Sequence, residues 1–289
     1  MRAKRSNPGL RKDSGLLRFA RNDEDARVLT RANGLRWDCE ETTMRLAVMS
    51  DVHGNLPALE AVLADIKMRG VDATVNLGDC VTSPLWPLET FELLQSLALP
   101  TVRGNHDRWI EELPDEKLSP AGRFARAALT AAQRRVLHAL PPRLALEQGI
   151  LAVHGTPDDD CALLLEEMLD DGRYVPARRD VLAGRLVNLG GATLVLCGHS
   201  HRQAMVQVPR GPLVVNPGSV GCPVFGDIPV APQLEYRSPH ARYAVLTERR
   251  GHWQAELLAL AYDWDHAAAR AAENGFPHWA GAYASGAVL

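Results

Sequence analysis

The chain alternates short apolar runs with amphipathic stretches, and this order of elements limits the folds open to it more than any other feature. An apolar run over residues 46–50 precedes a stretch over 56–69 in which apolar residues recur at helical spacing. The same order repeats over 73–77 and 88–97, and a third apolar run covers 100–103. Strands that alternate with helices in this way predict βαβ units built around a mostly parallel sheet.

Two further apolar runs, over 150–153 and 193–197, are predicted to join that sheet. The Ala- and Arg-rich segment 108–142 has helical character, and 158–189 is predicted to form two more amphipathic helices. Both segments are expected to cover the sheet. From Asp263 onward the pattern predicts a pair of helices that ends the chain.

The alternation changes after residue 201, where four short apolar segments follow without clear helices between them. The predicted strands cover 204–208, 213–215, 242–247 and 253–257. Because successive short strands of this kind tend to pair antiparallel, a second sheet is expected to pack on the first as a sandwich.

Polar motifs follow five of the predicted strands directly. They are Asp51-Val52-His53, Gly78-Asp79, Gly104-Asn105-His106-Asp107, His154-Gly155 and Gly198-His199-Ser200-His201. The carboxyl edge of an open α/β sheet is where loops from neighbouring strands converge on a ligand. The five loops are therefore expected to meet at one site.

The side chains in these motifs have the chemistry of metal ligands. Imidazole nitrogens mixed with carboxylate and amide oxygens suit Zn²⁺, Mn²⁺, Fe or Ni²⁺ better than Ca²⁺. In an extended segment, residues i and i+2 face the same way, so each Asp-x-His or His-x-His pair can reach one site. Seven candidate ligands are enough for two divalent metal ions: Asp51, His53, Asp79, Asn105, His154, His199 and His201. A carboxylate at Asp79 could bridge the two ions, one oxygen to each.

Composition excludes some classes of partner. A formal net charge of −3 gives no general attraction to nucleic acid or to an anionic membrane, and no apolar run is long enough for a membrane span. The five cysteines are widely spaced and odd in number, which argues against a disulfide framework. A cytoplasmic protein is expected.

The first 43 residues differ from the rest of the chain, because they are rich in charge and lack an apolar period. This composition predicts a disordered or non-native N-terminal extension, with Met44 as a candidate natural start. Residues 44–289 are then expected to form one domain with a C-terminal helical tail.

Taken together and in this order, the motifs resemble those of the calcineurin-like metallophosphoesterase superfamily, and within it the small bacterial metallophosphoesterases and phosphodiesterases. The resemblance implies an α/β fold, a four-layer α/β/β/α sandwich of two packed mixed sheets flanked by helices. It also implies a dinuclear metal centre. Asp51, His53 and His201 would hold one metal and Asn105, His154 and His199 the other, with Asp79 bridging.

The resemblance also implies roles in catalysis. A hydroxide bridging the metals would attack phosphorus, and Asp79 would hold the metals that generate it. Asn105 would contact both metal and phosphate, while His106 would face the substrate and protonate the leaving oxygen or stabilise phosphoryl charge. Asp107 would orient the loop. Arg103 is either a further phosphate ligand or a surface group.

One departure bears on the substrate. Protein phosphatases of the superfamily carry an Asp and an Arg where this chain has Thr82 and Ser83. The sequence therefore favours a phosphodiesterase that acts on a small phosphorylated or nucleotide-like substrate. Hydrolysis of a dinucleoside polyphosphate or of a phosphomonoester remains an alternative, and a non-catalytic scaffold of the same fold is a third.

Overall fold

The computed structural model describes residues 44–226 and 234–288. The longer strands are β1 (Met44–Met49), β2 (Ala73–Asn76), β3 (Arg143–Leu146), β4 (Ile150–Val153), β7 (Leu194–Leu196), β8 (Ala204–Gln207), β9 (Leu213–Asn216), β12 (Ala241–Arg249) and β13 (His252–Leu260). Two short hairpins are formed by β5 (Glu166–Met168) with β6 (Tyr174–Pro176), and by β10 (Val224–Phe225) with β11 (Leu234–Glu235). The helices are α2 (Leu56–Arg69), α3 (Pro87–Leu97), α4 (Asn105–Glu112), α5 (Pro120–Ala128), α6 (Ala131–His138), α7 (Arg179–Arg185), α8 (Trp264–Glu273) and α9 (Pro277–Ser285). The extension predicted over 1–43 lies outside the described residues.

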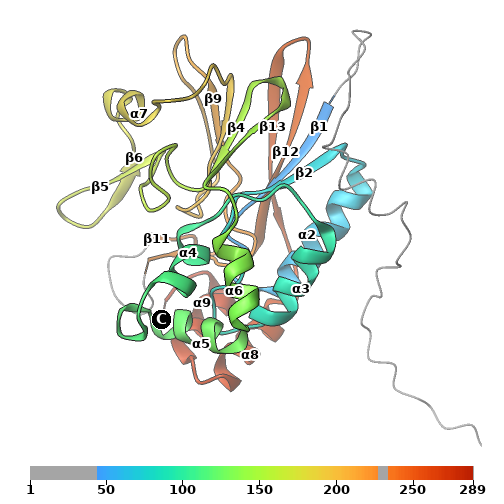
Figure 1. The fold of residues 1–289 in the computed structure, drawn as a ribbon, viewed down its shortest axis with the longest axis vertical. Coiled ribbons are helices and arrows are strands. Elements are labelled where there is room, and N and C mark those ends of the chain that lie inside the picture. The colour runs from blue at the N-terminus through green and yellow to red at the C-terminus, as the bar shows by residue number, and fades with distance from the viewer. Residues whose placement is uncertain (1–43, 227–233, 289) are drawn as a thin grey trace, which may run out of the picture.

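Two mixed sheets form the centre of the fold (Figure 1). The first has the order β13-β12-β1-β2, in which β1 pairs parallel with β2 and antiparallel with β12. The second has the order β3-β4-β7-β9-β8, in which β4, β7 and β9 are parallel and the two edge strands are antiparallel.

Alternating side chains of the strands separate two cores. Leu46 and Val48 of β1 point between the sheets, where they meet Ile150 and Ala152 of β4. The intervening residues of β1 point outward and pack with Leu59 and other apolar residues of α2. Strands of both sheets are thus buried on both faces, which explains their continuous apolar runs.

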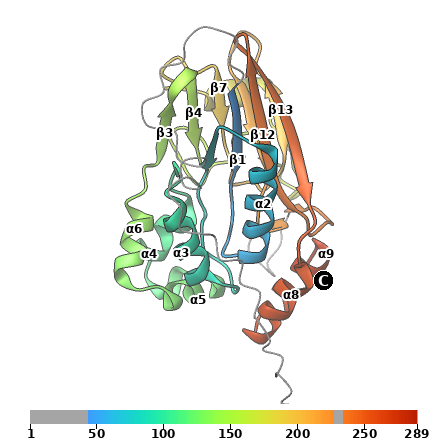
Figure 2. The same ribbon diagram turned by 90° about the vertical axis from the view of Figure 1, so that its right-hand side faces the viewer.

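Helices complete the outer layers. The outer face of the first sheet is covered by α2 and α3, and that of the second by α7 with the segment that precedes it. The predicted α/β/β/α sandwich with two packed mixed sheets is therefore confirmed. The predicted helix pair at the C-terminus is also present, as α8 and α9. Figures 1 and 2 both place α4, α5, α6, α8 and α9 beyond the same end of the sheets.

Three details of the sequence prediction were wrong. The run over 100–103 was predicted to be a strand but forms only an isolated bridge, between Thr101 and Asn76. The strands over 242–247 and 253–257 belong to the first sheet, beside β1, and the strands over 150–153 and 193–197 belong to the second. The apolar pattern of a strand indicates that both of its faces are buried. It does not indicate which sheet the strand joins, because the strands it pairs with are distant in sequence.

The segment 158–189 was predicted to form two helices but forms the β5–β6 hairpin and only one helix, α7. An Asp-Asp-Gly turn lies between the two strands, and its Gly172 has a φ of 81°. Such a turn followed by Tyr174 and Val175 is a hairpin signal that outweighs the helical spacing of the leucines.

No helix in the described ranges combines the length and the apolar character that crossing a bilayer requires.

Candidate metal centre

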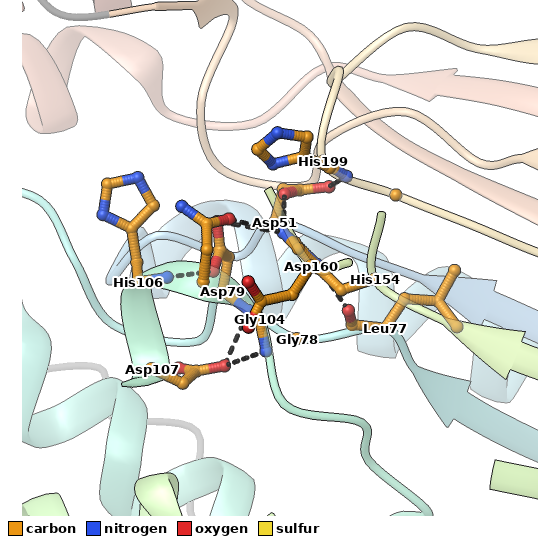
Figure 3. A network of polar contacts seen from close by, with 12 residues as sticks. Asp51, Leu77, Gly78, Asp79, Gly104, His106, Asp107, His154, Asp160 and His199 are labelled. Carbon is orange, nitrogen blue, oxygen red and sulfur yellow. Dashed lines mark hydrogen bonds and ion pairs between the residues drawn. The ribbon is translucent and has the colours of Figure 1, made fainter. Parts of the chain in front are cut away.

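The seven predicted ligands come together at the carboxyl ends of β1, β2, β4 and β7 and at the first turn of α4. Figure 3 labels Asp51, Asp79, His154 and His199 among them. All seven side chains are buried. Asp51, His53 and His201 form one group whose ligand atoms lie within 4.8 Å of one another, and Asp79, His154 and His199 form a second. The side-chain oxygen of Asn105 lies 3.0 Å from His154 Nε2 and so belongs with the second group.

Asp79 lies between the two groups. Its Oδ2 is 3.7 Å from His53 Nε2 in the first group and 3.3 Å from His154 Nε2 in the second. Its other oxygen, Oδ1, accepts a hydrogen bond from the main-chain N–H of His106 at 2.9 Å. Asp79 therefore faces both groups, which is the position that a bridging ligand requires. It does so through the single oxygen Oδ2, whereas one oxygen for each metal was expected from the sequence.

The backbone conformation of these ligands differs from the one that the sequence analysis assumed. An extended chain was expected, but Asp51 and His53 have φ of 55° and 46°, and His199 and His201 have φ of 66° and 59°. Asp79 has a φ of 55°. Non-glycine residues rarely adopt this left-handed region, and such strain concentrates at functional sites where the surrounding structure enforces it.

Each of the four candidate histidine ligands contacts a main-chain carbonyl through one ring nitrogen. The pairs are His53 Nδ1 with Thr82 O at 2.9 Å, His154 Nδ1 with Leu77 O at 2.7 Å, His201 Nδ1 with Val224 O at 2.6 Å and His199 Nε2 with Cys161 O at 2.9 Å. Because a carbonyl oxygen can only accept, the ring nitrogen in each pair must carry the proton. The opposite nitrogen of each ring is thereby left to ligate a metal, as in most metal-binding histidines.

Two features of the site fit a bound cation. Asp51 Oδ1 is buried and has no hydrogen-bond partner, yet it lies 3.5 Å from His201 Nε2 and 3.9 Å from His53 Nε2. The Nε2 atoms of His53 and His201 are themselves only 3.1 Å apart, although both rings already donate from Nδ1. Lone pairs and an unpaired carboxylate oxygen at such separations require a proton or a metal ion among them. The donor set suits first-row divalent ions.

The pKa shifts of the candidate ligands also fit a bound cation. Burial alone would raise the pKa of Asp51, but the neighbouring His201 lowers it to about 2. Burial alone would lower the pKa of His154, but the negative charge of Asp79 raises it to about 10. Without a metal, the site thus keeps its carboxylates ionised and attracts positive charge.

Asp107 holds two of the loops together from below the site, as Figure 3 shows. Its Oδ2 accepts hydrogen bonds from the main-chain N–H groups of Asp79 at 2.8 Å and Gly104 at 3.0 Å, and its Oδ1 accepts from Cys80 at 2.9 Å. Burial, and then the negative charge of Asp79, raise the pKa of Asp107 to about 7. The side chain ties the loop that carries Asp79 to the loop that carries Asn105.

Replacing Asp107 with Asn is expected to weaken metal binding about 10- to 100-fold, because the amide would turn a donor toward N–H groups that need an acceptor. Competition with a chromophoric chelator measures this affinity. Asp170→Asn, at an exposed turn, is the matched control and should bind metal like the unmodified protein. Unchanged affinity in Asp107→Asn would contradict the positioning role.

An ion pair between Arg108 and Asp160 helps to position His199. Arg108 of α4 donates to both carboxylate oxygens of Asp160, at 2.8 and 2.6 Å, and the next residue, Cys161, supplies the carbonyl that His199 contacts. Asp159 and Asp160 are near Cys161 in space as well as in sequence. The ion pair explains the position of Asp160 without a metal. Nothing in the sequence motifs pointed to these residues.

The centre opens into a cavity of about 270 Å³. His53, Asp79, Asn105 and His106 are among its lining residues, and so is Thr82. The His106 ring centroid lies 5.4 Å from that of His53, so the predicted substrate-facing histidine is beside the first ligand group.

Arg103 does not reach this cavity, and the expectation that it binds the substrate phosphate is not supported. Its Nη1 donates to the carbonyl of His138 at 2.9 Å, and its main-chain N–H donates to Pro141. Arg103 is not among the residues that line the cavity. The long side chain of an arginine can turn in either direction, and here it donates to a carbonyl at the end of α6.

A known protein is similar to this chain in sequence, and a solved structure is similar to it in fold. An uncharacterized protein of Methanocaldococcus jannaschii is 28% identical over 264 residues, which cover 82% of this chain and 95% of the relative. The crystal structure of a metallophosphoesterase from Sphaerobacter thermophilus has a TM-score of 0.64 and 26% identity, and the match covers 84% of this chain and 100% of that chain.

A family model described as the calcineurin-like phosphoesterase superfamily domain matches residues 44–237. The span begins with β1, ends beyond β11 and contains all seven candidate ligands. The superfamily inferred from the motifs is thereby confirmed: the chain belongs to the calcineurin-like phosphoesterase superfamily.

Proposed function

We propose that this protein is a dinuclear metal-dependent phosphodiesterase that hydrolyses P–O bonds in small or nucleotide-like substrates. The observation that carries the proposal is the position of Asp79 between two groups of buried ligands. Membership of a phosphoesterase superfamily supplies the reaction class. The proposal goes beyond superfamily membership in two respects, namely the presence of two metals and the preference for diesters.

Two divalent ions, held by the seven ligands with Asp79 shared, would polarise the phosphoryl group and supply a nucleophile at neutral pH. The chain's own residues orient the reaction. Carbonyl contacts fix the four histidine rings, and Asp107 fixes the loops of Asp79 and Asn105. His106 lines the cavity and would give a proton to the leaving oxygen.

The charge of the cavity favours diesters over more highly charged substrates. Among the described residues that line it there is no Lys or Arg, and Asp79 is the one carboxylate. A phosphodiester carries one negative charge, whereas a phosphomonoester or a polyphosphate carries more and gains most from additional cationic side chains. Thr82 lies in the cavity wall where protein phosphatases of the superfamily have an Asp, which further favours a diester.

The two enzymatic alternatives share the chemistry and differ in the pocket. They are hydrolysis of a dinucleoside polyphosphate and hydrolysis of a phosphomonoester. A scaffold role is disfavoured, because all seven ligands are present and their free nitrogens and oxygens converge.

The test compares kcat/KM for bis(4-nitrophenyl) phosphate, 4-nitrophenyl phosphate and a dinucleoside polyphosphate with Mn²⁺-loaded protein. The proposal expects the diester to be preferred at least about tenfold over each of the others after correction for intrinsic reactivity. A preference for the monoester or the polyphosphate would overturn the diester assignment. Absence of turnover on all three would overturn the enzymatic one.

Replacing His106 with Asn is expected to slow hydrolysis most for substrates whose leaving group must be protonated. For a dinucleotide with a sugar alcohol as leaving group, kcat should fall on the order of 10²-fold or more, because general acid catalysis contributes that much. For a 4-nitrophenyl diester, whose leaving group departs as an anion, the loss should be much smaller. Metal content should not change, since His106 is outside both ligand groups. Equal losses on both substrates would contradict a proton-donor role.

A cytoplasmic location remains a prediction from cysteine usage. In the described ranges Cys80, Cys161, Cys197 and Cys222 are free thiols. The proposed partner is the small phosphorylated substrate itself. Neither a membrane nor a nucleic-acid partner is proposed.

A further inference from the structure

Three aromatic side chains from distant parts of the chain line the cavity that opens from the metal centre. They are Trp109 of α4, Phe225 of β10 and Trp279 of α9. Pro120 and Ala121, at the start of α5, add further apolar surface to the same wall. The cavity thus has a polar end with the candidate ligands and an extensive apolar wall.

Two of the aromatic rings lie directly beside catalytic or ligand residues. Trp109 follows His106 by three residues on α4, and their ring centroids are 5.0 Å apart at an interplanar angle of 67°. The ring of Phe225 lies 5.2 Å from that of His199 and 5.8 Å from that of His201. A group attached to phosphorus at the metal centre would therefore meet an aromatic surface at once.

The third ring is held in place from behind. Trp279 packs against a buried cluster of Cys222, Val224 and Ala282, and its ring lies 5.8 Å from that of Tyr283. A ring that is fixed before the ligand arrives loses little conformational entropy on binding. Trp279 also lies beyond residue 237, where the match to the superfamily domain ends. The C-terminal helices therefore contribute to the pocket as well as closing the fold.

We propose that Trp109, Phe225 and Trp279 form a subsite for a planar, uncharged group, a nucleobase or an aryl ring, carried by a monoanionic phosphodiester. The subsite depends on the proposed function for the position of the phosphoryl group at the metals. Aromatic rings bind planar groups through stacking and edge contacts without needing charge. The absence of Lys and Arg from the described lining residues matches such a ligand.

Two non-hydrolysable monoanions isolate the subsite from catalysis. Diphenylphosphinate carries two aryl rings on phosphorus, and dimethylphosphinate carries the same charge without them. Titration calorimetry with Mn²⁺-loaded protein should show diphenylphosphinate binding at least about tenfold more tightly, the scale expected for one ring on an aromatic surface. In Trp279→Leu and Trp109→Leu the difference should shrink to about threefold or less.

Three controls distinguish a loss of the aromatic subsite from a loss of protein stability. Trp279→Phe keeps an aromatic surface and should retain most of the preference. Trp264→Leu removes a tryptophan of α8 that does not line the cavity, and should retain all of it. The melting temperature and metal content of each variant show whether it is folded. If Trp279→Leu does not fold, Trp109→Leu carries the test.

The same proteins are then assayed on bis(4-nitrophenyl) phosphate and methyl 4-nitrophenyl phosphate, which share a leaving group. In Trp279→Leu, kcat/KM should fall by about tenfold on the diaryl ester and by much less on the methyl ester. Hydrolysis of both esters with equal binding of the two phosphinates would overturn the subsite and leave the proposed function standing. Tryptophan-dependent binding of diphenylphosphinate without hydrolysis of either ester would overturn the proposed function and leave the subsite standing. If neither phosphinate binds, the subsite is refuted.

Discussion

Replacing Asp79 with Asn is expected to lower kcat/KM on a phosphodiester by about a thousandfold or more. Asp79 Oδ2 faces His154 at 3.3 Å and His53 at 3.7 Å, so its negative charge serves both ligand groups. An amide is neutral and has one oxygen in place of two. Loss of a shared ligand removes several kcal/mol of charge stabilisation in the transition state, and each 1.4 kcal/mol corresponds to a factor of about ten.

Metal analysis distinguishes the reason for that loss. The unmodified protein should hold two divalent ions per chain, and Asp79→Asn should hold one or none at the same free-metal concentration. Asp265→Asn, at an exposed position in the first turn of α8, should keep both ions and full activity. Unchanged kcat/KM in Asp79→Asn would refute the assignment of the centre. Full activity with a single ion in the unmodified protein would refute its dinuclear form.

Removal of metal is expected to abolish turnover and also to destabilise the fold. Without a cation, Asp51 Oδ1 is buried with no hydrogen-bond partner, and the Nε2 atoms of His53 and His201 lie 3.1 Å apart. A ligand bound only by the folded state stabilises it by about 3–4 kcal/mol at 100 to 1,000 times its Kd. For a chain of this length that corresponds to a fall in melting temperature of roughly 5–15 °C after chelation.

Calorimetry and assay of the same samples measure both effects. Adding Mn²⁺ should restore activity and melting temperature together, whereas Ca²⁺ should restore neither, because it prefers sites built from oxygen ligands. A protein that purifies with nearly no metal and gains no activity on reconstitution would favour the scaffold alternative. Recovery of stability without activity would place the metals in a structural role.

The candidate ligands could be predicted from sequence because they occur in short motifs. Asp51 and His53, or His199 and His201, lie in single short loops, and each loop follows an apolar run that predicts a strand. Element order predicted that the five loops meet at the edge of one sheet. They do meet, but β1 and β2 belong to the first sheet and β4 and β7 to the second, which only the tertiary structure shows. The pattern could not reveal the left-handed backbone of these residues, because it is enforced by surrounding contacts and is not preferred by the residues themselves.

The segment 158–189 shows where a local pattern failed, and Arg103 shows where one left two roles open. The side chain of Arg103 is long enough to turn in either direction, and in the structure it donates to the His138 carbonyl at the end of α6. In 158–189, the spacing of apolar residues was compatible with helix, but the Asp-Asp-Gly turn produced a hairpin. For Arg103 a contact with a residue distant in sequence was decisive, whereas in 158–189 one local signal outweighed another.

By itself, the sequence determined the class of fold, the end of the sheets where the site lies, and the set of side chains that can bind metal. These depend on periodicity and on loops a few residues long. Tertiary structure alone decided which sheet each strand joins, which ring nitrogen of each histidine is left to ligate a metal, and which aromatic side chains line the cavity. The reason is physical: the Val224 carbonyl that orients His201, and Trp279 from the last helix, reach the site only when the chain has folded.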